Sequence, residues 1–158
     1  MSSRSLTLAV AALLGVMAGT AQAQEAKLSW GPAPPSLPAG ALFALVSGDP
    51  GKEGRFELQL SMPDGYTIPP HWHPTDENVT VISGHFHYGM GDSIDGKTMK
   101  SLDKGQSVSL QANMRHYARA EGPTVVSVSG NGPFAITYVN QADDPRHKGM
   151  HHAKPKEK

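Results

Sequence analysis

The chain has 158 residues, a length that suits one compact domain, and its 14 Lys and Arg residues balance 14 Asp and Glu residues. This balance argues against a nucleic-acid-binding protein, which normally has a basic stripe, and the absence of cysteine excludes disulfides and thiolate metal sites. The 17 glycines and 13 prolines favour many turns and short strands over long helices, while the eight histidines are candidate metal ligands.

The first 23 residues have the pattern of an export signal. Arg4 precedes an apolar run at 6–19, and Ala21 and Ala23 supply the small residues of a cleavage site. The run is shorter than the ~20 residues needed to cross a bilayer, which makes a retained membrane anchor the less favoured alternative. We therefore expect residues 1–23 to be a signal peptide and the mature chain to be periplasmic or secreted, with no membrane anchor after cleavage.

Short extended segments follow one another through the rest of the chain. A proline-rich lead-in at 24–40 comes first, and residues 55–62 then alternate between apolar and polar side chains, as a strand with one buried face does. Turn residues separate the segments, and none has a sustained helical period. The predicted strands are 41–47, 55–62, 66–73, 77–83, 85–90, 106–110, 115–120, 124–129 and 133–140.

Strands of this kind, spaced by about 8–12 residues with turn residues between them, predict an all-β fold, either an antiparallel sandwich or a barrel. We expect this barrel to occupy residues 41–140. Residues 141–158 are rich in Pro, Lys and His and show no apolar periodicity. They are expected to form a polar tail without stable structure.

One stretch concentrates possible metal ligands. On a strand, His71 and His73 are two residues apart, so both imidazoles project from the same face. Pro74 ends that strand, and Glu77 begins the next, so its carboxylate can return to the same interior. Two imidazoles and one carboxylate can occupy one face of a metal coordination sphere, although a His-x-His pair alone also occurs where no metal binds.

The complete arrangement resembles the first motif of the cupin superfamily, in which a Gly, five residues, His-x-His, three or four residues, a Glu, six residues and a second Gly follow one another. This chain matches those positions at Gly65, His71, His73, Glu77 and Gly84. The resemblance implies a single cupin-type antiparallel β-barrel, a jelly-roll-like double sheet, over most of the mature chain.

A second stretch resembles the second cupin motif in part. Gly105 and His116 fall on motif positions, but the family usually has Pro where this chain has Gln111, Gly where it has Asn113 and Asn where it has Ala120. Because Asn tolerates the left-handed backbone that a Gly would supply, the turn can persist. His116 is retained as the matching metal-ligand position.

The resemblance therefore implies one divalent transition metal ion held by His71, His73, Glu77 and His116, with one or two positions left for water or a ligand. Imidazole and carboxylate ligands suit Zn, Cu, Mn, Fe, Co or Ni, so the identity of the metal stays open. Folding outside the cytoplasm removes cytoplasmic control of the metal supply, and raw affinity then favours Cu and Zn.

Similar cupin sites occur in dioxygenases, decarboxylases, isomerases and lyases, and the same architecture also serves non-catalytic proteins that bind a metal or a small ligand. Both functions stay open, with a small molecule as the expected partner and no catalytic residue identified. Many small cupin domains pair through their sheet edges, which makes a homodimer a reasonable expectation.

The residues around the site predict an apolar cavity. Val79 and Val81 share a face with Glu77, and Phe134 and Ile136 form another same-face set with Tyr138. No Arg or Lys that would grip a carboxylate is evident among these residues, so the substrate is expected to be uncharged or weakly charged. The candidate proton carriers are Tyr66, Asp76 and Tyr138.

Two further faces can be assigned from alternation. Phe86 alternates with the second His-x-His pair, His85 and His87, and should take the core, which sends the two histidines outward. An inward role for His87 remains the alternative. The strand that carries His116 has Tyr117 on its opposite face, which we expect to lie on the solvent side.

Overall fold

The computed structural model describes residues 27–147, and the expected signal peptide at 1–23 lies outside that range. Within it the chain forms nine strands and two short 3-10 helices. Their bounds are β1 (Gly31–Pro32), β2 (Leu42–Ser47), β3 (Gly54–Met62), β4 (Thr67–Trp72), β5 (Glu77–Met90), β6 (Lys100–Asp103), β7 (Ser107–Leu110), β8 (His116–Gly132), β9 (Thr137–Tyr138), η1 (Gln141–Asp143) and η2 (Pro145–His147). No helix between residues 27 and 147 has the length and apolar character needed to cross a bilayer.

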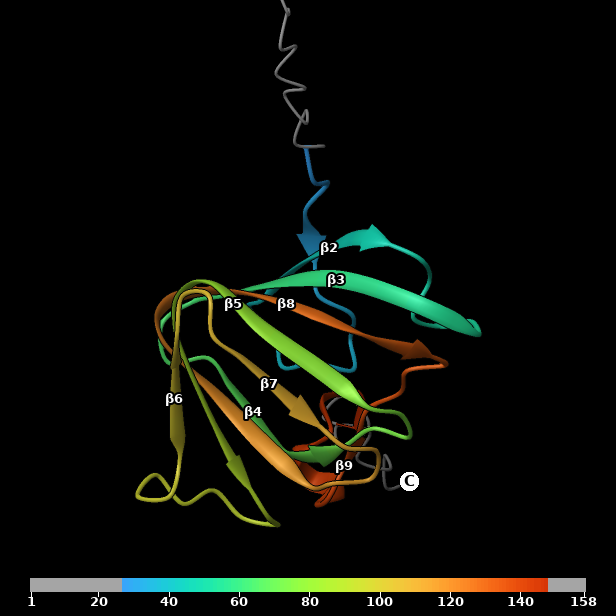
Figure 1. Ribbon diagram of the computed structural model, residues 1–158. Coiled ribbons are helices and arrows are strands. Elements are labelled where there is room, and N and C mark those ends of the chain that lie inside the picture. The colour runs from blue at the N-terminus through green and yellow to red at the C-terminus, as the bar shows by residue number, and fades with distance from the viewer. Residues whose placement is uncertain (1–26, 148–158) are drawn as a thin grey trace, which may run out of the picture.

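The nine strands pair antiparallel throughout and curl into a barrel-like sheet (Figure 1). The two long strands β5 and β8 pair along most of their length, from Glu77 opposite Gly130 to Met90 opposite His116. The first part of β8 also pairs with β4, and its second part pairs with β3. The predicted all-β antiparallel barrel is confirmed, and the pairing of β4 with β8 brings distant histidines together.

Two pairs of predicted strands are in fact the single long strands β5 and β8. The register of β5 against β8 shifts between Val81 and His85, which bends both strands without ending them. Gly84 lies at this bend with a φ of 81°, and a Cβ there would lie 2.5 Å from the carbonyl oxygen of Pro123. Glycine is required because both the backbone conformation and the close approach exclude a side chain.

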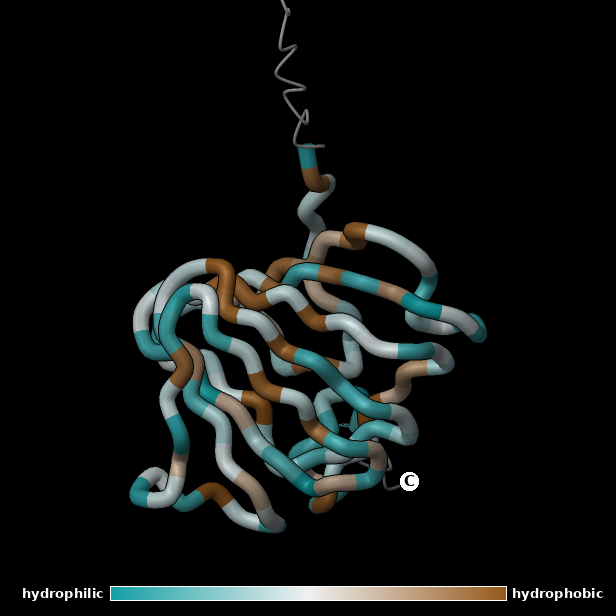
Figure 2. The backbone as a smooth tube through the Cα atoms, viewed as in Figure 1, coloured by the Kyte–Doolittle hydropathy of each residue, from teal (hydrophilic) through white to brown (hydrophobic). Residues whose placement is uncertain are grey.

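The core lies inside the curl of the sheet. The alternating apolar residues of β3 point inward as predicted, and each is at most 9% exposed: Phe56, Leu58, Leu60 and Met62. Figure 2 shows apolar and polar residues alternating along the strands. Burying a large apolar side chain stabilises the fold by about 1.5–3 kcal/mol, so this one face makes a substantial contribution.

The proline-rich lead-in is held against the barrel by two buried tyrosines. The hydroxyl of Tyr66 donates a hydrogen bond to the carbonyl of Pro38, and the hydroxyl of Tyr138 donates one to the carbonyl of Ser36. The short strand β1 also pairs with β2. These contacts fix the lead-in beside the barrel interior.

Residues 141–147, which the composition assigns to the polar tail, form η1 and η2. Asp144 is only 6% exposed, and its carboxylate accepts hydrogen bonds from the side chain of Arg146. A local ion pair therefore orders a segment that has no apolar periodicity. The remaining tail, 148–158, lies outside the described residues.

The expectation for Tyr117 was wrong. Its side chain is fully buried, and its hydroxyl hydrogen-bonds with the backbone of Asp95. A Cβ on Gly89 would lie only 2.3 Å from the tyrosine ring, so the ring packs directly on that backbone. Because a loop between β5 and β6 covers this face, strand alternation alone could not distinguish it from a solvent-exposed face.

Candidate metal centre

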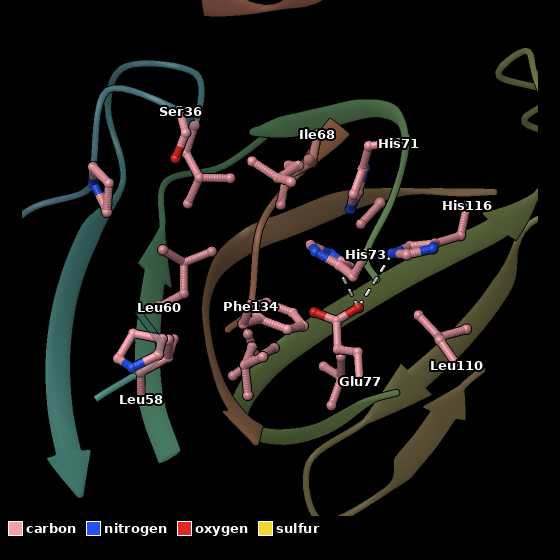
Figure 3. A pocket seen from close by; sticks show the side chains of 18 of the residues that line it. Ser36, Leu58, Leu60, Ile68, His71, His73, Glu77, Leu110, His116 and Phe134 are labelled. Carbon is pink, nitrogen blue, oxygen red and sulfur yellow. Dashed lines mark ion pairs between the residues drawn. The ribbon is translucent and has the colours of Figure 1, made fainter. Parts of the chain in front are cut away.

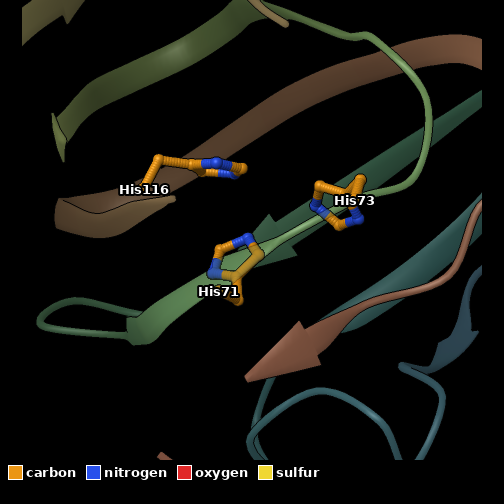
Figure 4. A group of neighbouring side chains, drawn as sticks. All are labelled: His71, His73 and His116. Carbon is orange, nitrogen blue, oxygen red and sulfur yellow. The ribbon is translucent and has the colours of Figure 1, made fainter. Parts of the chain in front are cut away.

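Three histidines converge inside the barrel (Figure 4). His71 lies on β4, His73 follows that strand directly, and His116 begins β8, where it pairs with His71. One nitrogen from each ring lies within 4.8 Å of the other two, and none of the three residues is more than 6% exposed. This histidine cluster could hold a metal ion.

Backbone carbonyls orient all three rings in the same way. Each Nδ1 lies 2.7–2.9 Å from a carbonyl oxygen, which belongs to Pro69 for His71, to Ala135 for His73 and to Met114 for His116. Because a carbonyl oxygen only accepts, each Nδ1 carries a hydrogen, and in a neutral ring the Nε2 then keeps its lone pair. The Nε2 of His116 is buried and has no hydrogen-bond partner within residues 27–147.

Glu77 reaches the cluster from the start of β5 (Figure 3). Its Oε2 lies 3.2 Å from the Nε2 of His116 and 3.7 Å from the Nε2 of His73. The carboxylate is buried, with the residue only 8% exposed. The structure thus brings together the four side chains that the cupin resemblance selected.

Burial and the neighbouring side chains shift the pKa values of His71, His73 and Glu77. Burial, reinforced by the neighbouring His116 and His73, lowers the pKa of His71 from 6.5 to about 3, and burial also lowers the pKa of His73. Burial alone would raise the pKa of Glu77, but the surrounding imidazoles, His116 foremost, lower it below its ordinary value. Neutral imidazole and ionised carboxylate are the forms that bind metal ions.

A cavity of about 240 Å³ lies beside the four side chains. Its volume is below the ~300–1,000 Å³ that is typical of drug-sized ligand sites, so only a small molecule fits. Most of the lining is apolar, and labelled examples in Figure 3 are Leu58, Leu60, Ile68, Leu110 and Phe134. Of the predicted walls, Val79, Phe134 and Ile136 line the cavity, while Val81 and Tyr138 are buried elsewhere in the structure.

Several lining residues come from segments in which sequence patterns predicted no site. Pro34, Ser36 and Leu37 belong to the lead-in, and Arg146 belongs to the segment assigned to the tail. Contrary to the expectation of a cavity without Arg or Lys, a guanidinium lies at its wall. Irregular segments have no hydrophobic periodicity from which their position against the barrel could be predicted. The one available signal in the sequence was the presence of acidic and basic residues around Pro145, which can form a local ion pair.

The three candidate proton carriers have other partners. The hydroxyls of Tyr66 and Tyr138 donate to lead-in carbonyls, and burial raises the pKa of Tyr66 to about 12. The carboxylate of Asp76 accepts a hydrogen bond from the backbone N–H of Ala112. The carboxylate that lies beside the histidine cluster is instead that of Glu77.

The second His-x-His pair faces outward, as predicted. Phe86 takes the core, while His85 lies 2.8 Å from the carboxylate of Asp103 and His87 lies 2.7 Å from that of Glu121. Each of these two histidines contacts a carboxylate on a neighbouring strand. They do not join the buried cluster.

Comparisons with known proteins agree with the geometry. The family model described as "Cupin domain" matches residues 58–129. A comparison with curated protein sequences finds no significant match.

Among solved structures, the polyketide cyclase RemF from Streptomyces resistomycificus is 15% identical, with a TM-score of 0.55 over 68% of this chain and 76% of that chain. The DMSP lyase DddQ from Ruegeria pomeroyi DSS-3 is 20% identical, with a TM-score of 0.55 over 70% of this chain and 60% of that one. An RmlC-like cupin from Shewanella frigidimarina NCIMB 400 is 13% identical, with a TM-score of 0.53 over 66% of this chain and 84% of that chain. At these identities the likeness shows the fold.

Proposed function

Because the chain belongs to the cupin superfamily, we propose that His71, His73, His116 and Glu77 hold one divalent transition metal ion. The observation that carries this proposal is the buried Nε2 of His116, which has no hydrogen-bond partner among the described residues. Its polar neighbour at 3.2 Å, Oε2 of Glu77, accepts hydrogen bonds when ionised and cannot donate one to the lone pair of Nε2. Leaving a buried polar atom unpaired costs about 1–3 kcal/mol, and a metal ion would remove that cost. The carbonyl contacts of all three Nδ1 atoms leave each Nε2 available for the same ion.

Zn, Cu, Mn, Fe, Co and Ni all suit this set of ligands. The pattern of residues 1–23 supports export to the periplasm or beyond, where the metal supply is not controlled by the cytoplasm. Affinity then favours Cu and Zn, which bind imidazole more tightly than Mn and Fe do.

We propose that the centre serves a metal-dependent enzyme that acts on a small molecule, by dioxygenase, lyase, isomerase or decarboxylase chemistry. When bound, the metal would supply a Lewis acid and open positions for an oxygen ligand. The protein contributes a largely apolar wall, and Glu77 holds a negative charge beside two imidazoles. Buried charge of this kind acts more strongly than it would in water.

A non-catalytic cupin that binds a metal or a small ligand is the second candidate. The specific observation in its favour is that the hydroxyls of Tyr66 and Tyr138 are engaged by lead-in carbonyls and are not directed to the cluster as acids or bases. The same cavity would then retain a ligand without transforming it. A homodimer that pairs through sheet edges is a further proposal for either function.

The test is the metal content of untagged protein that has matured in its own compartment. About one metal ion per chain is expected in the wild type and in the control His85→Ala, whose imidazole lies on the surface. His71→Ala should lose the ion while circular dichroism shows an intact β fold. A metal-free wild type, or full metal content in His71→Ala, would overturn the assignment.

The identity of the metal then selects the assay that separates the two candidates. Iron, copper, nickel or manganese would lead to oxygen-uptake measurements, while zinc would favour lyase, isomerase or binding roles. Turnover that disappears in His71→Ala would establish the enzyme. Ligand retention without turnover would establish the binding protein.

A further inference from the structure

Part of the cavity wall is built outside the segment that matches the cupin family model. That match covers residues 58–129, whereas the lead-in and the segment after β8 both reach the cavity. The lining residues from these two segments include Pro34, Ser36, Leu37, Phe134, Ile136 and Arg146. The choice of ligand therefore depends on residues that the matched domain does not contain.

Arg146 is the only Lys or Arg that lines the cavity in the described part of the chain. Its Nε lies 2.8 Å from Oδ1 of Asp144, and its Nη2 lies 2.6 Å from Oδ2 of the same carboxylate. Asp144 is nearly fully buried, so this two-point contact fixes the plane of the guanidinium. Arg146 itself is about half exposed, which leaves part of the group accessible.

The donors of Arg146 are only partly used. Nη2 also donates to the carbonyl of Ile136 at 3.2 Å, but no residue between 27 and 147 accepts a hydrogen bond from Nη1. Asp144 offsets much of the formal charge. What remains is a pair of N–H donors in a fixed plane, which suits directed hydrogen bonds to an oxygen-bearing group.

Three consecutive residues connect this guanidinium with the histidine cluster. Phe134 stacks on His73, the carbonyl of Ala135 accepts the hydrogen of the His73 Nδ1, and the carbonyl of Ile136 accepts from Arg146. The segment 134–136 therefore positions both the imidazole and the guanidinium. The histidine cluster and the Arg146 guanidinium are therefore held at fixed positions in a cavity whose remaining walls are largely apolar.

We propose that Arg146 binds the carboxylate of a small aliphatic acid, whose carbon chain lies against the apolar wall of the cavity. This proposal rests on the proposed function, because it names the class of molecule for the same cavity. The two N–H groups of Nη1, from which no described residue accepts a hydrogen bond, would donate charge-assisted hydrogen bonds to that carboxylate. In the metal-free chain, Glu77 would repel that group from the histidine end, so the charges of Glu77 and Arg146 also set the orientation of the ligand there.

The proposal is tested with pentanoate as the probe and with pentan-1-ol and pentylamine as neutral and cationic molecules of the same length. Binding to the metal-free full chain is measured by calorimetry for the wild type and for Arg146→Gln. Pentanoate should bind the wild type most tightly and lose about tenfold or more in affinity in Arg146→Gln, because a charge-assisted hydrogen bond is lost. Binding of pentan-1-ol should not change.

Arg119→Gln serves as the matched control, since Arg119 is exposed on β8 and does not line the cavity. It should bind pentanoate as the wild type does. Arg146→Lys keeps a cation beside Asp144 but loses the planar fork, and we expect an intermediate affinity. That variant decides the question if Arg146→Gln does not fold. Unchanged pentanoate affinity in the Arg146 variants, or no pentanoate binding by the wild type, would overturn the proposal.

Metal content is measured in parallel so that the two proposals can fail separately. Arg146→Gln should keep the metal content of the wild type, because no hydrogen bond or ion pair joins the Arg146 side chain to His71, His73 or His116. A wild type without metal whose pentanoate binding depends on Arg146 would refute the metal centre alone. If the wild type contains metal but its pentanoate affinity is the same as in the Arg146 variants, the carboxylate subsite alone is refuted.

Discussion

The ring of Phe134 stacks on the imidazole of His73, with ring centroids 4.1 Å apart and an angle of 15° between the planes. The next carbonyl along the chain, that of Ala135, lies 2.8 Å from the Nδ1 of the same histidine. One side of the ring and one of its nitrogens are therefore fixed by neighbouring residues. The orientation of this candidate ligand depends on a segment that follows β8.

Replacing Phe134 should test that dependence. We expect Phe134→Leu to weaken metal binding by about tenfold, since partners that orient a histidine ligand typically contribute 10–100-fold to metal affinity. Competition with a chelating dye measures the change. Phe43→Leu is the control, because Phe43 lines the same cavity without stacking on a histidine. Equal losses in the two variants would show that cavity volume matters and stacking does not.

Glu77→Gln should separate the charge of this residue from its size. The amide occupies nearly the same volume but carries no negative charge beside His116 and His73. Because loss of an outer partner already costs 10–100-fold, loss of the charged ligand that we propose at Glu77 should lower metal affinity by at least about 100-fold. Titration calorimetry of the metal-free protein measures this. Wild-type affinity in Glu77→Gln would remove Glu77 from the ligand set.

The metal-free protein should lose stability as the pH falls from 6.5 towards 3. The pKa of His71 is about 3 in the folded state and 6.5 ordinarily, so in this window the unfolded chain binds a proton that the folded chain excludes. Each unit by which the pH falls then lowers the free energy of unfolding by up to about 1.4 kcal/mol. The lowered pKa of Glu77 acts in the same direction below 4.5.

Urea denaturation of chelator-treated protein at pH 7.5, 5.5 and 4.5 measures this effect. His71→Asn removes one titrating group and should reduce the dependence, while the lowered pKa of His73 maintains the rest of it. A wild-type free energy of unfolding that stays constant across these pH values would contradict the assignment of His71 as a buried neutral imidazole.

The two motif glycines of the first cupin stretch should differ in their tolerance of alanine. Gly65 and Gly84 have φ values of 71° and 81°, but a Cβ on Gly65 would meet nothing within 4 Å, whereas one on Gly84 would lie 2.5 Å from the backbone of Pro123. Gly65→Ala should cost about 1 kcal/mol from backbone conformation, and Gly84→Ala at least about 3 kcal/mol. Urea denaturation compares them, and equal costs would show that the clash at the bend relaxes.

Much of the site could be anticipated because its ligands follow a strand period. His71 and His73 share a face since they are two residues apart, and Glu77 begins the next strand. The position of His116 came from the cupin resemblance, and the structure places it opposite His71 through the pairing of β4 with β8. The hydrogen bonds from Nδ1 to backbone carbonyls were not predicted, because they depend on the three-dimensional path of each loop.

The amino-acid sequence by itself determined the all-β character, the inward face of β3 and the grouping of two histidines with Glu77, since all of these follow from residues close together in the chain. Only the tertiary structure decided that Tyr117 is buried beneath a loop and that Arg146 lines the cavity. The physical reason is that alternation assigns a side chain to one face of a strand. Whether solvent, a loop or a distant segment covers that face depends on how the whole chain packs.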